Sequence, residues 1–202
     1  MDTKQKISNK ALEMFNERGI EYVGLRELAA LLDMRVSNIT YYFPTKDDLV
    51  NELSLELTRL NSKVLVENKN LTMTLFLQML RRVFYNQVAY RCLFLSFVHL
   101  MEQNKLMAAR YAKTQGRRNA TLKSTINVLV ASGYLKKECE TAFLVSALAL
   151  INRFWISEAA VSFHRLNAEG QIRHYLTLIA TLLLPYATAK GTKEIRVFIK
   201  DL

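Results

Sequence analysis

The chain has few of the residues that build turns and cross-links. Of its 202 residues, six are glycine, two are proline and two are cysteine. So few Gly and Pro residues leave too little turn chemistry for a sandwich or barrel of many short strands, which favours helices. The two cysteines, Cys92 and Cys139, are far apart and lie in helix-like sequence. They exclude a disulfide framework and a four-cysteine zinc site, and we interpret them as small buried apolar residues. We expect an all-α protein of the cytoplasm.

The sequence also lacks recognisable targeting, membrane-spanning and catalytic segments. Its charged first ten residues are followed by no apolar stretch of the signal-peptide kind. The longest apolar stretch, 142–151, contains a serine and ends at Asn152 and Arg153, so it is too short to span a bilayer. There is no glycine-rich phosphate loop or nucleophile elbow. The histidines show no metal-ligand spacing: they are His99, His164 and His174. We expect no membrane partner, no metal, no cofactor and no enzyme.

Positive charge is abundant but unevenly distributed. Lys and Arg number 28 against 18 Asp and Glu, so the formal net charge is +10. Residues 1–50 contain seven basic and eight acidic side chains, whereas residues 81–137 contain eleven basic side chains and the single acid Glu102. We interpret most of this surplus as a solvated face. The alternatives are non-specific attraction to DNA, or an anionic effector near a group of four cations: Arg110, Lys113, Arg117 and Arg118.

Hydrophobic periodicity predicts a series of helices. The first ends at Arg18 before a C-cap glycine, and two short helices follow at 25–32 and 36–42. Thr45 is expected to cap a fourth helix of about five turns that ends at 68–70. The remaining helices are expected at 71–85, 89–103, 106–131, 140–163 and 169–187. Residues 192–202 are either a last short helix or disordered.

Two short helices joined by the break at 33–35 have the shape of a helix-turn-helix. The second, 36–42, offers mainly Ile39 to a core, followed by Phe43, so its polar face is available to another partner. Its Asn, Ser and Thr side chains, with the Arg before it, can read base edges, and Tyr hydroxyls suit phosphate oxygens. The pattern favours a DNA-reading helix.

Three stretches of sequence resemble the TetR family of bacterial regulators. They are ALEMFNERG (11–19), LRELA (25–29) and ITYYFPTKDDL (39–49), and the resemblance covers about residues 7–50. It implies a three-helix DNA-binding domain at 1–48 with its recognition helix at about 36–42, and a larger helical domain at 49–202 that binds an effector and dimerises. Two positions depart from the family pattern: Asp33 stands where Gly is common and Thr40 where Tyr is common. Asp33 must then enter the left-handed region at a cost.

The resemblance also implies which residues contact double-stranded operator DNA. Gly24 opens the second helix, where backbone N–H groups can meet a phosphate. Tyr42 and Lys46 correspond to backbone anchors, and the groove-facing side chains are Arg35, Val36, Ser37, Asn38 and Tyr41. At Thr40 the family's phosphate contact is either missing or supplied by Tyr41. The full set is Gly24, Arg35, Val36, Ser37, Asn38, Thr40, Tyr41, Tyr42 and Lys46.

A homodimer is expected from the helices at 140–163 and 169–187. Both are apolar on more than one face, so one face can pack internally while the other needs a partner. A two-fold four-helix interface is the simplest arrangement, and it places two recognition helices on successive major grooves. The expected interface residues are Phe143, Ala147, Ile151, Phe154, Leu176, Ile179 and Leu183.

A pocket for an apolar or amphipathic small-molecule effector is expected in the larger domain. Large apolar and sulfur-containing side chains suit such a pocket, although a filled core is an alternative for each of them. Asn152 and Arg153 are the candidate polar contacts, and a salt bridge across the dimer interface is the alternative for the arginine. The expected lining residues are Met73, Phe76, Met79, Leu80, Phe94, Phe97, Asn152, Arg153 and Trp155.

The sequence therefore predicts a DNA-binding transcriptional regulator. The expected mechanism is that of a repressor released from a palindromic operator by its effector, which requires the effector to bind two states unequally. The alternative is a helical ligand- or lipid-binding interaction module with a vestigial helix-turn-helix.

Overall fold

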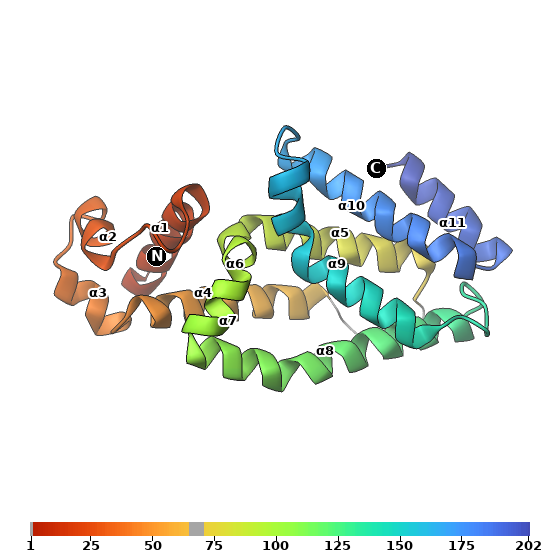
Figure 1. The fold of residues 1–202 in the computed structure, drawn as a ribbon, viewed down its shortest axis with the longest axis horizontal. Helices are drawn as coiled ribbons and strands as arrows, with labels where there is room; N and C mark the ends of the chain where they lie inside the picture. Colours follow the sequence, from red (N-terminus) through yellow and green to blue (C-terminus); the bar gives the residue numbers. More distant parts are fainter. Residues whose placement is uncertain (1, 65–70) are drawn as a thin grey trace. The chain divides into compact units, whose positions relative to one another are not determined.

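The chain is described by a computed structural model, which covers residues 2–64 and 71–202. Within these residues there are eleven α-helices and one 3₁₀ turn and no strand, which confirms the all-α expectation. The expected helix break at 68–70 lies outside the described residues. The helices, coloured along the chain in Figure 1, are α1 (Thr3–Arg18), α2 (Leu25–Leu31), α3 (Val36–Tyr42), α4 (Lys46–Val64), α5 (Met73–Ala89), α6 (Arg91–Leu95), α7 (Phe97–Gln103), α8 (Lys105–Ala131), α9 (Thr141–Ser162), α10 (Ala168–Leu183), η1 (Leu184–Tyr186) and α11 (Ala189–Lys200).

The chain divides into two compact units, each built from two separate segments. Unit 1 comprises Met1–Asn61 and Ala89–Ala112, and unit 2 comprises Ser62–Val88 and Lys113–Leu202. Unit 1 therefore contains the residues 1–48 expected for a DNA-binding domain, together with most of α4, both short helices α6 and α7, and the start of α8.

The core of unit 1 follows from the apolar stripe on α1. Ile7, Ala11 and Phe15 recur every four residues, which places them on one helix face, and all three are buried. The cluster that they belong to also includes Leu28 of α2 and Ile39 of α3. The three N-terminal helices are thus packed around one core, as the sequence predicts.

Two local features set the angles between these helices. Asp33 has φ 53° and is the single non-glycine residue with positive φ in the described part of the chain. This confirms that the turn between α2 and α3 requires the left-handed region, at a residue type that tolerates it. Thr45 precedes α4, and its Oγ1 accepts a hydrogen bond from the Asp48 backbone N–H at 3.1 Å, while Asp48 Oδ2 accepts one from the Thr45 backbone N–H at 3.0 Å. This reciprocal pair is a capping box, and it confirms Thr45 as the N-terminal cap.

Two expectations about the later helices are wrong, and for the tail the alternative of a last short helix is confirmed. Residues 89–103 do not form one helix, because the chain bends at Ser96 (φ −94°, ψ 13°) and separates α6 from α7. The helix expected to reach residue 187 ends at Leu183 and continues as one 3₁₀ turn that contains Pro185. The tail is ordered as α11, which begins at Ala189, three residues before the expected start.

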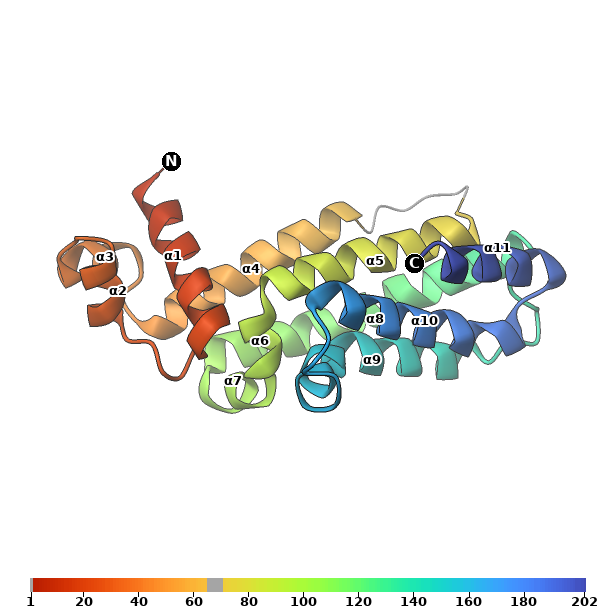
Figure 2. The ribbon, with the colours of Figure 1, turned by 90° about the horizontal axis from the view of Figure 1, so that it is seen from above.

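Unit 2 is held together by α5, α9, α10 and α11. In Figure 1 and Figure 2, α11 folds back to lie beside α10. Thr188 caps α11, and its Oγ1 also donates to the Gly133 carbonyl at 2.7 Å in the turn after α8. Gly191 sits so close to this turn that a Cβ at its position would meet the Tyr134 carbonyl oxygen at 2.1 Å. Only glycine therefore permits this close approach of α11.

Candidate functional site

Helix α3, the expected recognition helix, exposes most of its side chains to solvent. Of its seven residues, Ile39 alone is buried. Tyr41 is 80% exposed, and the N-cap residue Arg35 adopts an extended backbone (φ −73°, ψ 145°). Val36, Ser37 and Asn38 of the expected DNA-binding set are also exposed. These five side chains therefore all face solvent, four of them at the start of α3 and Tyr41 near its end.

Two further members of the expected set are partly engaged by the protein itself. Thr40 Oγ1 donates to the Ser37 carbonyl at 3.3 Å, so its hydroxyl proton is held within the helix. Tyr42 is half-buried against the core of unit 1, and its ring lies edge-on to that of Tyr41 at 5.0 Å between centroids. Thr40, which stands where the family commonly has Tyr, thus has a hydroxyl that donates to its own helix.

Lys46 connects the start of α4 to the loop that follows α1. Its Nζ donates to the carbonyls of Ile20 at 3.0 Å and Glu21 at 3.4 Å. An ammonium group has three N–H donors, so one donor is left for a phosphate. Gly24 is exposed as the N-cap of α2, and no atom lies within 4 Å of the position where a Cβ would stand.

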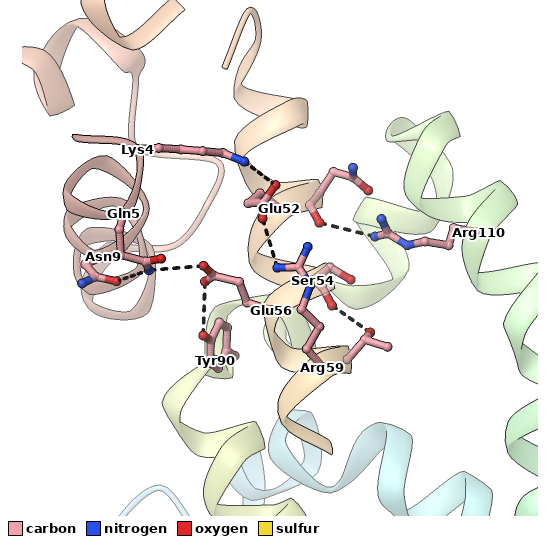
Figure 3. A network of polar contacts seen from close by, with 11 residues as sticks. Lys4, Gln5, Asn9, Glu52, Ser54, Glu56, Arg59, Tyr90 and Arg110 are labelled. Atoms are coloured by element: carbon pink, nitrogen blue, oxygen red, sulfur yellow. Dashed lines mark hydrogen bonds and ion pairs between the residues drawn. The ribbon is translucent and has the colours of Figure 1, made fainter. Parts of the chain in front are cut away.

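A network of polar contacts supports α4 from both sides (Figure 3). Glu52 accepts hydrogen bonds from Lys4 at 3.0 Å and from Arg59 at 3.3 Å. Burial alone would raise the pKa of Glu52, but the hydrogen bond and charge of Lys4 and those of Arg59 outweigh it and hold the pKa below its usual value. One turn later, Glu56 accepts from Gln5 at 3.2 Å. The carboxylates of Glu52 and Glu56 are thus matched by donors from α1, from α4 itself and from Tyr90.

Two asparagines attach α6, α7 and the start of α8 to α1 and α4 within unit 1. Asn16 of α1 donates from Nδ2 to the Ala89 carbonyl at 2.8 Å, and its Oδ1 accepts from the Cys92 backbone N–H at 3.0 Å. Asn104 is buried, and its Nδ2 donates to the Asp47 carbonyl at 3.2 Å. Sequence reasoning missed both residues. Single asparagines in an otherwise periodic pattern carry no signal of a partner that is 57 to 76 residues away.

Cys92 packs into the same core as an apolar side chain. Burial raises the pKa of its thiol to about 12, so the group stays protonated at neutral pH. Cys139 is also buried, and both are free thiols. This confirms the interpretation of the two cysteines as small buried residues.

In unit 2, a buried polar chain joins α5 to α9. Trp155 Nε1 donates to Gln87 Oε1 at 2.6 Å, and Gln87 Nε2 donates to the carbonyl oxygen and to Oδ1 of Asn152, both at 3.1 Å. The Trp155 ring stacks on Phe84 with 4.5 Å between centroids and lies 5.4 Å from the ring of Tyr175. The sequence pointed to Asn152 and Trp155 but missed Gln87, the residue that links them.

The hydroxyl of Tyr175 stands out in this cluster. The side chain is buried, and its oxygen has no hydrogen-bond partner among the described residues. A buried hydroxyl without a partner is costly, so the group is suited to meet a bound molecule or a water.

The nine residues expected to line an effector pocket do not all fall in one unit. Met73, Phe76 and Trp155 are buried in unit 2. Four more residues of unit 2 are half-buried: Met79, Leu80, Asn152 and Arg153. Phe94 and Phe97 belong to unit 1, where Phe94 packs against the core and the Phe97 ring meets Tyr111 at 5.2 Å.

The expected dimer residues fall into two groups. Leu176, Ile179 and Leu183 of α10 are fully buried within unit 2, so they belong to its core and not to its surface. This corrects their assignment, and the reason is that α10 is covered by its neighbours α9 and α11. The α9 residues are accessible: Phe143 is exposed, while Ala147, Ile151 and Phe154 are half-buried.

Helix α9 is unusually apolar for a helix with so much open surface. It is the one helix among the described residues that is long and apolar enough to cross a membrane by length and composition, yet only 28% of that stretch is buried. Its apolar part is longer than the sequence stretch 142–151 suggests, because the helix continues past Asn152 and Arg153 to Ser162. A core helix of a globular protein meets the same criterion.

Comparisons with known proteins agree with this geometry. Residues 7–53 match the family model described as bacterial regulatory proteins, tetR family, and residues 57–195 match that described as bacterial transcriptional repressor. A probable HTH-type transcriptional regulator of Bacillus subtilis (strain 168), YttP, is 31% identical over 139 residues, which cover 68% of this chain and 60% of that protein. The HTH-type transcriptional regulator LuxR of Vibrio harveyi is 37% identical over 68 residues, 34% of this chain and 33% of that protein. The chain thus spans at most about 60% of these two relatives.

Among solved structures, a TetR-family transcriptional regulator from Marinobacter aquaeolei VT8 has the same fold. It superimposes with a TM-score of 0.88 at 21% sequence identity, over 100% of this chain and 98% of that one. The match to the second family model covers residues 57–195, which is more than half of the sequence. It lies outside residues 7–50, where the sequence resembles the family. This chain therefore belongs to the TetR family of bacterial transcriptional regulators.

Proposed function

We propose that this chain is a homodimeric, sequence-specific DNA-binding repressor of the bacterial cytoplasm, which leaves a palindromic operator when a small molecule binds. The observation that carries the proposal is the composition of α3. Six of its seven residues are not buried, and the exposed ones are those that suit base edges and phosphates. A helix that contributes a single side chain to its core is suited to the major groove.

Within this proposal, α3 reads sequence through side chains near its start. Asn38 is the candidate for a bidentate contact to adenine and Arg35 for a contact to guanine. Ser37 and Val36 complete the groove-facing set. The exposed Tyr41 replaces Thr40 as a phosphate contact, because the Thr40 hydroxyl donates to its own helix. Gly24, Tyr42 and Lys46 hold the backbone beside this surface.

The dimer is proposed to form through α9 and the outer face of α10. Phe143, Leu150, Ile151 and Phe154 follow one another at helical spacing on α9, and Leu178 adds an exposed leucine on α10. An apolar helix with little of its surface buried in one chain is stabilised by a second copy. Association of two such helix pairs gives the two-fold arrangement that a palindrome requires.

The effector is proposed to bind in unit 2 near the aromatic rings of Trp155 and Tyr175. The unpartnered Tyr175 hydroxyl and the Gln87–Asn152 pair are polar groups within an otherwise apolar environment, which suits an apolar or amphipathic molecule with one polar group. Such a ligand changes DNA affinity only to the extent that it binds the two states unequally.

Binding to the intergenic DNA next to the gene tests the proposal. In fluorescence anisotropy, the wild type is expected to prefer one palindromic duplex over a scrambled one. The Asn38→Ala variant should reduce that preference by about 5- to 150-fold, the equivalent of roughly 1–3 kcal/mol for one base contact. The exposed Asn127 on α8 provides a matched control, and Asn127→Ala should leave the preference unchanged. Equal binding of the wild type to all duplexes would contradict the proposal.

Sedimentation velocity tests the dimer separately. Leu150 is 58% exposed in the single chain, so Leu150→Glu should shift the protein toward monomer by placing a charge in the proposed interface. Val197 on α11 is 51% exposed, and Val197→Glu should remain dimeric. If both variants sediment as the wild type does, the interface lies elsewhere.

A further inference from the structure

The net positive charge of the chain belongs to one of its two units. Unit 1, which contains the DNA-reading helices, has eleven basic and eleven acidic side chains. Unit 2 has seventeen basic and seven acidic side chains, so it carries the whole net charge of +10. Unit 1, which is proposed to read sequence, thus has no net charge, and unit 2 has the whole surplus of positive charge.

Helix α8, which is 27 residues long, contains six basic side chains and no acidic one. Four of them belong to unit 2, namely Lys113, Arg117, Arg118 and Lys123. Between 113 and 124, its exposed positions hold either a cation or a very short side chain. They are Lys113, Gly116, Arg117, Arg118, Ala120, Lys123 and Ser124. The exposed residues between the cations have short side chains, so the charged groups project beyond their neighbours. A large anion can therefore approach them closely.

Three of these cations have no counter-charge in the described part of the chain. Lys113, Arg117 and Lys123 take part in none of the salt bridges or hydrogen bonds among the described residues. Lys113 and Arg117 are one helical turn apart, a spacing at which like charges destabilise a helix. The surface formed by these three residues, the α8 cationic surface, therefore has a cost in the isolated protein that an anionic partner would remove.

We propose that the α8 cationic surface binds the phosphates of duplex DNA without reading its sequence. The inference rests on the proposed function, because a protein that reads an operator is held close to DNA. From Lys113 to Lys123 the helix rises about 15 Å, a length along which duplex DNA presents several phosphates. This contact supplies the sequence-independent attraction that the neutral unit 1 lacks, while α3 supplies the choice of site.

A lipid surface fits these observations less well. Helices that bind membranes insert an apolar face between the lipids. The apolar side of α8 is occupied within unit 2, where Ile126 and Leu129 are fully buried. The exposed side between 113 and 124 has no large apolar residue to insert.

The salt dependence of DNA binding tests the proposal. The triple variant Lys113→Gln, Arg117→Gln, Lys123→Gln is compared with a control that removes the same charge from α11, namely Lys193→Gln, Arg196→Gln, Lys200→Gln. All six side chains are exposed and belong to unit 2. The slope of log K against log salt should fall by about 2 to 3 for the α8 variant, on both operator and scrambled duplexes, since each phosphate contact contributes about 0.9. The operator preference should be unchanged, and the α11 control should keep most of the wild-type slope.

Three outcomes would overturn the proposal. An unchanged slope in the α8 variant would show that its cations do not meet phosphates. An equal loss in both triple variants would show that net charge acts without a defined surface. Binding to phosphatidylglycerol vesicles that depends on these three cations, with DNA slopes unaffected, would identify a lipid partner instead. A wild type without operator preference, but with a slope that depends on α8, would refute the proposed repressor function and leave this inference standing.

Discussion

The close approach of α11 to the turn after α8 gives a prediction whose sign opposes simple helix propensity. In an isolated helix, replacing glycine by alanine is stabilising by up to about 1 kcal/mol. At Gly191 the added Cβ would lie 2.1 Å from the Tyr134 carbonyl oxygen and 3.1 Å from its carbon. A Cβ essentially never contacts another heavy atom at less than 3.0 Å, so the chain must move by about 1 Å to admit the methyl group. Gly191→Ala is therefore expected to destabilise unit 2.

The magnitude follows from what must move. Both partners are backbone, so no side-chain rotation relieves the contact, and α11 must shift away from the turn. Such a shift disturbs the Thr188 bond to Gly133 and the packing of the buried Ile195 and Phe198. Overpacking costs about 1–3 kcal/mol, and the propensity gain offsets up to about 1 of it. We expect a net loss of about 2 kcal/mol, or roughly 4–8 °C in melting temperature for a chain of this size.

Thermal unfolding at fixed protein concentration measures this effect, with Gly116→Ala as the control. Gly116 is an exposed glycine within α8, and no atom lies within 4 Å of its would-be Cβ. Its replacement should raise stability by about 0.4–1 kcal/mol. If Gly191→Ala is as stabilising as Gly116→Ala, the close approach of α11 is refuted.

Two further predictions concern buried and charged groups. Gln87→Leu removes the acceptor of the buried Trp155 N–H, so the free energy of unfolding measured in denaturant should fall by about 1–3 kcal/mol. Adding Trp155→Phe should recover part of this loss, because the unpaired N–H is then removed. Additive losses in the two variants would contradict the pairing. The pKa of Glu52 is lowered in the folded chain, so its ion pairs stabilise unit 1 at pH values above 4.5, the ordinary pKa of the group. This stabilisation is lost as the pH falls through the lowered pKa. The stability difference between the wild type and Glu52→Gln should therefore shrink from neutral pH to well below 4.5, and a difference that grows on acidification would rule out the Lys4 and Arg59 contacts as its source.

The N-terminal part of the fold could be predicted because its signals are local. The apolar stripe of α1, the glycine after Arg18 and the capping box that begins at Thr45 each depend on residues at most four positions apart. The exposure of α3 could be predicted for the same reason, since a seven-residue helix with one apolar side chain facing the core has no other way to pack. The positive φ of Asp33 was implied by the family resemblance, because Gly is common at this position.

The features that could not be predicted depend on contacts between distant segments. The break at Ser96 is set by the core of unit 1, which takes Cys92 and Leu93 from one side of it and Leu100 from the other. The burial of α10 depends on α11, which the sequence left undecided. Once α11 covers α10, leucines such as Leu176 face a neighbour within the same chain instead of a second copy. Periodicity shows how many faces of a helix are apolar, but not which element covers each face.

The two-segment construction of unit 1 has a consequence for the order of folding. Its core combines residues of α1 with Cys92, Leu93 and Met107, and the Asn16 contact to Cys92 joins positions 76 residues apart. During synthesis, α1, α2 and α3 leave the ribosome long before the segment that completes their core. Contacts of such separation also slow folding, because the intervening loop must be closed first. We therefore expect a nascent chain that ends near residue 61 to expose apolar surface of α1 until α6 and α7 have been made.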